Sequence, residues 1–145
     1  MKSLIIVAAL VGALAVAVGV ANASQTFSAS IYRSPSYTCS AGAADTSGAK
    51  YGTFTVTDTH GSQVVDASVT VDDLYPFRAY NVSVTEFGHS CLTNSNVTSF
   101  VTDKGGKAIV HFQFWAHTGE KAAWVTIRHG LTNDIVRSTA LPINQ

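Results

Sequence analysis

The stretch that decides the fold is residues 69–84, which reads Val69-Thr-Val-Asp-Asp-Leu-Tyr-Pro-Phe-Arg-Ala-Tyr-Asn-Val-Ser-Val84. Apolar and polar residues alternate at both of its ends, as they do in β-strands that bury one face. Its centre holds two adjacent aspartates and a proline, which are typical of a turn. The stretch therefore predicts two strands joined by a turn.

The same pattern extends outward in both directions. Segments rich in β-branched and aromatic residues recur about every ten residues between Gly, Asp, Asn and Pro, and no segment after residue 23 has a helical period with caps. The expected strands lie near residues 25–32, 51–57, 63–71, 78–87, 97–102, 107–117, 122–129 and 134–141. This spacing predicts an all-β domain, a sandwich of seven to eight antiparallel strands.

Within the deciding stretch, Leu74, Pro76, Tyr80 and Val82 form a Leu-x-Pro-x-x-x-Tyr-x-Val pattern. This pattern resembles that of fibronectin type III and related immunoglobulin-like domains. The resemblance implies an extracellular β-sandwich in which Tyr80 forms a tyrosine corner, with its hydroxyl bonded to nearby backbone. It implies no particular ligand.

The first 23 residues have the composition of a signal peptide. Met1-Lys2 supplies a positive start, residues 4–20 are apolar or small, and Ala21-Asn22-Ala23 has the small-x-small form of a cleavage site. We expect cleavage after Ala23, a single secreted domain over 24–145, and no stable membrane insertion afterwards. The alternative is that the leader stays uncleaved and anchors the chain.

The chain has two cysteines, Cys39 and Cys91. An even number of cysteines in an exported chain predicts a disulfide, which would tie the Ser- and Gly-rich segment 34–50 to the turn after Phe87. The alternative, two separate buried thiols, applies if the chain stays in a reducing compartment. A disulfide would also withdraw both thiols from metal binding and catalysis.

Charge and histidine content argue against several functions. Nine basic residues balance nine acidic ones, so no basic footprint for nucleic acid is present. The histidines are His60, His89, His111, His117 and His129. Their spacing does not give the converging ligands that zinc needs, and the adjacent Asp72 and Asp73 would point to opposite faces of a strand. We therefore expect no metal, no cofactor and no enzymatic activity.

Two N-glycosylation sequons are present, at Asn81-Val-Ser83 and Asn96-Val-Thr98. Side chains alternate between the two faces of a strand, and Asn81 lies between Tyr80 and Val82. Its side chain is therefore expected to lie on the opposite face from theirs, toward solvent. Both asparagines matter only if the host glycosylates its exported proteins.

Residues 107–129 read as a hairpin around Gly119-Glu120. In that hairpin Trp115 lies opposite Trp124, while Phe112, Phe114, Val125 and Ile127 form the core side. The outward side would then be a contact face made of His111, Gln113, Trp115, His117, Trp124 and Arg128. The alternative is that the tryptophans pack under a loop or under the strand next to the leader.

These observations favour a secreted, non-enzymatic structural or adhesion module. Its expected partners are other copies of itself, or an extracellular protein or glycan. Assembly would use the tryptophan-bearing face or exchange of the nearly uncharged segment 25–32. The alternative is a small secreted binding protein for an apolar ligand, a glycan or a target protein, and an enzyme is the third choice.

Overall fold

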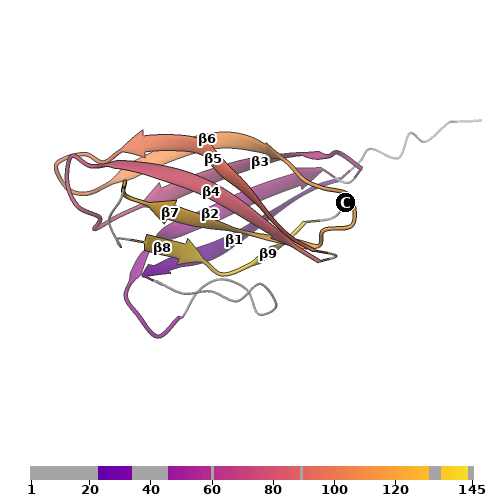
Figure 1. The fold of residues 1–145 in the computed structure, drawn as a ribbon, viewed down its shortest axis with the longest axis horizontal. Helices are drawn as coiled ribbons and strands as arrows, with labels where there is room; N and C mark the ends of the chain where they lie inside the picture. The colour runs from indigo at the N-terminus through magenta and orange to yellow at the C-terminus, as the bar shows by residue number, and fades with distance from the viewer. Residues whose placement is uncertain (1–22, 34–45, 60, 89, 131–134, 144–145) are drawn as a thin grey trace, which may run out of the picture.

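The computed structural model describes residues 23–33, 46–59, 61–88, 90–130 and 135–143, and these form strands joined by turns (Figure 1). Within these ranges no helix is present. The same ranges therefore contain no helix that could cross a membrane. The predicted all-β class is confirmed.

The strands are β1 (Ser24–Arg33), β2 (Lys50–Thr59), β3 (Val64–Val71), β4 (Ala79–Phe87), β5 (Cys91–Val101), β6 (Ala108–Trp115), β7 (Ala122–Arg128), β8 (Ile135–Ser138) and β9 (Leu141–Pro142). Every segment predicted as a strand contains one. Most boundaries shift by one or two residues, and two differences are larger: β5 begins six residues earlier, at Cys91, and the last segment is divided into β8 and β9.

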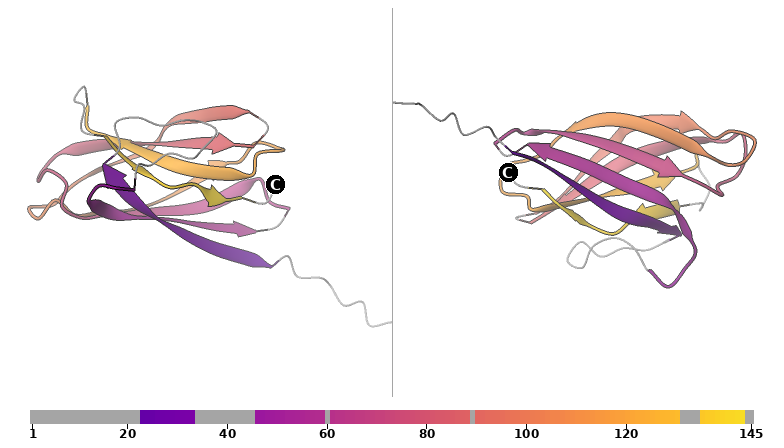
Figure 2. Two further views of the ribbon diagram at one scale, coloured as in Figure 1. Left: turned by 90° about the horizontal axis from the view of Figure 1, so that it is seen from below. Right: turned by 180° about the vertical axis from the view of Figure 1, so that it is seen from behind.

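The strands form one antiparallel sheet in the order β5-β4-β7-β8-β1-β2-β3-β6, with β9 paired to β7. The sheet curls, so that its first strand, β5, lies near its last strand, β6 (Figures 1 and 2). Among the described strands, β5 pairs only with β4 and β6 pairs only with β3. β5 and β6 are therefore the two edges of the sheet.

The core fills the inside of this curl. Along β3, for example, Val65, Ala67, Val69 and Val71 are buried and the residues between them are not, which follows from the two-residue period of a strand. At the two edges the burial is weaker: Val97 of β5 and Val110 and Phe112 of β6 are only partly buried against the core. The inner surface is thus least covered where the sheet stays open.

The turn predicted inside the deciding stretch is held by Tyr80. Its ring is buried and stacks on Phe100 with 5.6 Å between ring centroids. Its hydroxyl accepts a hydrogen bond of 3.3 Å from the backbone N–H of Tyr75, five residues upstream. This is the backbone bond expected of a tyrosine corner.

The turn between β5 and β6 packs directly on this first turn. A Cβ atom at Gly106 would lie 2.0 Å from the carbonyl oxygen of Leu74, and Gly106 has a φ of 74°, so a glycine is required. In the same turn Asp103 Oδ1 accepts hydrogen bonds from the N–H groups of Gly105 and Lys107, at 2.8 and 2.9 Å. The Lys107 and Gly105 backbone bonds lower the pKa of the Asp103 carboxyl group.

The predicted hairpin between residues 107 and 129 is wrong. β6 pairs with β3 and β7 pairs with β4, so Trp115 lies opposite Val64 and Trp124 lies opposite Thr85. The two strands are consecutive in the sequence but belong to different parts of the curled sheet. The chain between them crosses from one part to the other instead of turning back on itself. The predicted core side is nevertheless correct: Phe114, Val125 and Ile127 are buried and Phe112 is partly buried.

The segment expected to exchange between molecules pairs within its own chain. β1 pairs with β2 over nine residue pairs, and its last three residues also pair with β8. The strand is therefore already part of the sheet in a single chain.

Candidate contact surface

The outer side of β6 consists of Ile109, His111, Gln113 and Trp115, which alternate with the inward residues of the strand. All four are exposed, and the two largest apolar side chains among them, Ile109 and Trp115, are 68% and 57% exposed. An exposed tryptophan is uncommon because burying its ring stabilises a fold by several kcal/mol, roughly as other large apolar side chains do. The outer side of β6 therefore combines apolar and hydrogen-bonding groups on an open strand.

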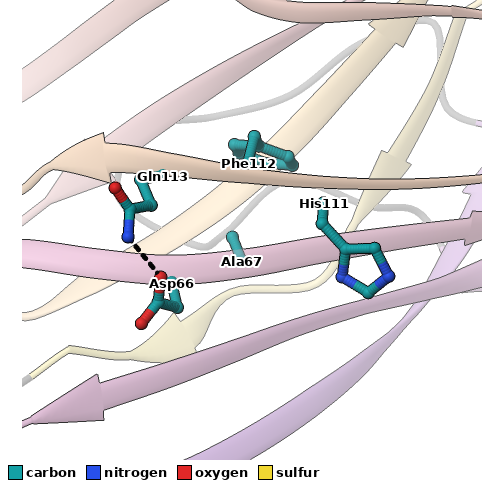
Figure 3. A pocket seen from close by; sticks show the side chains of 5 residues that line it. All are labelled: Asp66, Ala67, His111, Phe112 and Gln113. Atoms are coloured by element: carbon teal, nitrogen blue, oxygen red, sulfur yellow. Dashed lines mark hydrogen bonds between the residues drawn. The ribbon is translucent and has the colours of Figure 1, made fainter.

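A hollow of about 470 Å³ lies on this part of β3 and β6 (Figure 3). It is lined by Asp66, Ala67, His111, Phe112 and Gln113. Asp66 lies opposite Gln113 in the ladder, and Gln113 Nε2 donates a hydrogen bond of 2.6 Å to Asp66 Oδ1. The hollow thus presents the amide of Gln113 and the imidazole of His111, two and four residues along β6 from Trp115, and the carboxylate of Asp66 on the neighbouring strand β3.

Farther along the sheet from β6, beyond β3, the outer face of β1 and β2 carries hydroxyl groups. Hydroxyl pairs join β1 and β2 at 2.9 to 3.0 Å, namely Ser24 with Thr59, Thr26 with Thr57 and Ser28 with Thr55. Such cross-strand pairs stabilise a sheet modestly. β6, with Ile109 and Trp115, is thus more apolar on its outer side than β1 and β2.

Glu86 fixes the position of the chain directly after Trp115. Its side chain is fully buried, and Oε1 accepts a hydrogen bond of 2.8 Å from the backbone N–H of His117. Oε2 lies 2.7 Å from Nδ1 of the half-exposed His117 ring and also accepts a bond of 3.0 Å from Asn94. Glu86 thereby ties the end of β6 to β4 and β5.

A second buried carboxylate, Glu120, fixes the other side of the same turn. Its Oε1 accepts hydrogen bonds from the backbone N–H and the hydroxyl of Ser90, at 3.1 and 2.8 Å. Glu86 and Glu120 thus both hold chain segments in place. In the part of the chain that the structure describes, no group of three or more His, Cys, Asp or Glu side chains is placed to hold a metal ion.

The predicted contact face is not one surface. His111, Gln113 and Trp115 do lie together on β6, and His117 lies beyond the end of that strand. Trp124, by contrast, is fully buried, and Arg128 is an exposed residue at the end of β7. The prediction assumed that β6 and β7 pair, and it placed Trp124 on an exposed face that the structure does not have.

The remaining predicted sites are placed as follows. Asn81 is exposed, as its strand parity predicts. The side chain of Asn96 and all of Cys39 lie outside the described residues, and Cys91 is the exposed first residue of β5. The disulfide between Cys39 and Cys91 therefore remains a prediction.

Three residues outside the outer side of β6 have features that were not predicted from the sequence. Tyr75 and Phe77 are exposed on the turn before β4, and Phe77 has a φ of 53°, which is rare for a bulky residue. The buried position of Glu86 could have been predicted from the sequence. It shares the inward parity of Tyr80, Val82 and Val84, so a charged residue occurs there at a core position.

No protein-family model matches this chain, and no curated protein or solved structure is significantly similar to it. Its function must therefore be inferred from its own residues and contacts.

Proposed function

We propose that this chain is a secreted, non-enzymatic structural or adhesion module, an immunoglobulin-like sandwich that contacts its partner through the outer side of β6. The observation that carries the proposal is the exposure of Trp115 at an unpaired edge of the sheet. Tryptophan is enriched among the residues that contribute most to protein interfaces. A large apolar side chain held in water by a well-packed strand is best explained by a partner that covers it.

The arrangement of the polar groups supports a contact role over a catalytic one. The two buried carboxylates, Glu86 and Glu120, are bound by donors that hold turns in place. The groups that face solvent near Trp115 lie on a regular strand, which supplies a rigid surface. The signal-peptide composition of residues 1–23 supports secretion.

One observation favours the alternative, a secreted binding protein for a glycan. The hollow beside Gln113 offers an amide, a carboxylate and an imidazole, and Trp115 lies on the same side of β6. A polar ligand with one apolar face would find both hydrogen-bonding groups and an aromatic surface there.

Replacing Trp115 by Ser tests the proposed function. The fraction of secreted protein that stays attached to the surface of the producing cells is expected to fall by about tenfold or more, since interface tryptophans commonly contribute about 2 kcal/mol or more. The melting temperature should stay nearly unchanged because the side chain is mostly exposed. The matched control is Phe77→Ser, which removes another exposed aromatic ring far along the chain from β6.

Equal attachment of the wild type and the Trp115→Ser variant would contradict the proposal. Tryptophan fluorescence then decides on the alternative. The chain has two tryptophans, and only Trp115 is exposed. If a glycan binds in the hollow, titration with soluble oligosaccharides should change the emission of the wild type and leave that of Trp115→Ser unchanged.

A further inference from the structure

The backbone of β6 offers a free row of hydrogen-bonding groups. Ala116, just after the strand, donates its N–H to the carbonyl oxygen of Gln63 at 2.8 Å, so even-numbered residues point their backbone groups toward β3. Because these directions alternate along an antiparallel ladder, Ile109, His111, Gln113 and Trp115 point theirs away from β3. Among the described strands, none pairs with that side of β6.

This edge lacks the features that normally prevent edge-to-edge pairing. β6 contains no charged residue and no proline, and it pairs with β3 over eight consecutive residues without a bulge. The other edge is less regular, because the pairing of β4 with β5 shifts register between Val82 and Val84. Of these two end strands, β6 is therefore the better suited to receive another strand.

We propose that the strand received by β6 is the β6 of a second copy of this chain, paired antiparallel about a two-fold axis at Phe112. The proposal rests on the proposed function and deepens it by naming the partner. In this pairing, residues equally distant from Phe112 face each other across the axis. Ile109 then lies opposite Trp115 of the second copy, and His111 lies opposite Gln113 of the second copy.

The side chains of β6 are self-complementary in this register. It places apolar residues opposite apolar ones and hydrogen-bonding residues opposite hydrogen-bonding ones, with no like charges in contact. Shifting the axis to His111 or Gln113 would place Trp115 or Ile109 opposite polar residues or beyond the strand. The four residues of the outer side would also exchange all their free backbone bonds with the second copy.

Two further properties favour a second copy as the partner. The formal net charge of the chain is zero, so two copies do not repel each other strongly. A two-fold axis uses each β6 once, which closes the assembly at two copies. The result would be a continuous sheet that runs through both chains.

Sedimentation velocity of the protein produced from the complete 145-residue chain tests this inference. The wild type is expected to change from monomer to dimer as its concentration rises through the micromolar range. The double variant His111→Lys with Gln113→Lys places like charges opposite each other, and its dimerisation should be weaker by about tenfold or more. The double variant His111→Glu with Gln113→Lys places opposite charges together and should dimerise at least as well as the wild type.

The control is Thr26→Lys with Ser28→Lys, which adds two lysines to exposed positions on β1, away from β6. It should dimerise like the wild type. A wild type that stays monomeric throughout overturns the inference, as does a double-lysine β6 variant that dimerises normally. If the Glu-Lys variant is as weak as the double-lysine variant, the axis at Phe112 is wrong.

These outcomes are separable from the test of the proposed function. If the wild type is monomeric but Trp115→Ser still loses attachment to cells, the contact surface on β6 is supported. Only the second copy as its partner is then wrong. If the wild type dimerises but Trp115→Ser does not change its attachment to cells, the β6 pairing is supported. The proposed adhesion role is then wrong.

Discussion

Replacing Trp124 by Ser is expected to lower the free energy of unfolding by about 3 to 5 kcal/mol, the loss found when a buried aromatic residue is truncated. Trp124 is fully buried on β7, beside the core residues Ala123 and Val125. A loss of this size is a large part of the total stability of a domain, commonly about 5 to 15 kcal/mol. Urea unfolding of the variant and the wild type measures it.

Trp115→Ser is the matched control, because it makes the same substitution at an exposed position. Its free energy of unfolding should differ from that of the wild type by no more than about 0.5 kcal/mol, as for most surface substitutions. Equal destabilisation by the two variants would mean that Trp115 is also covered within the single chain, and would remove the basis for a contact surface on β6.

The second large effect is expected from Glu86→Ala. The buried carboxylate accepts hydrogen bonds from the backbone and ring of His117 and from Asn94. Removing it leaves those groups without their partner inside the protein, and each buried polar group left unsatisfied costs about 1 to 3 kcal/mol. Chemical denaturation gives the free energy directly, and faster amide exchange around His117 would locate the damage at the end of β6.

Two variants calibrate this result. Glu86→Gln keeps the shape and one carbonyl acceptor, so its loss should be smaller than that of Glu86→Ala. Asp66→Ala removes an exposed carboxylate that bonds Gln113, and it should cost no more than about 1 kcal/mol. If Glu86→Ala is no more destabilising than Asp66→Ala, then Glu86 does not anchor the end of β6.

The strands could be predicted from the sequence, while their pairing could not. The alternation of residues 63–71 and 78–87 is local, because each residue's face depends only on its position in the strand. Pairing depends on where distant segments lie. β6 and β7 are consecutive and have matching parity, yet β3 and β4 are their actual partners. Nothing in the short segment between them distinguishes a hairpin from a crossing.

The candidate site could be predicted only in part, for the same reason. The parity of β6 correctly groups His111, Gln113 and Trp115 on the outward side. Trp124 has the parity opposite to the buried Val125 and Ile127, and it is buried all the same. The position of a residue in the alternating pattern gives the face of the strand on which its side chain lies. Whether that face is covered is decided by packing against the rest of the fold, which local sequence does not reveal.

Amide hydrogen exchange along β6 decides whether the outer side of that strand is a contact surface. In dilute protein, the amides of Ile109, His111, Gln113 and Trp115 should exchange fast, while those of Phe112 and Phe114, which point toward β3, exchange slowly. When the protein is engaged with its partner, the four fast amides are expected to slow by about tenfold or more. Unchanged exchange at these four positions, with new protection elsewhere on the molecule, would contradict it.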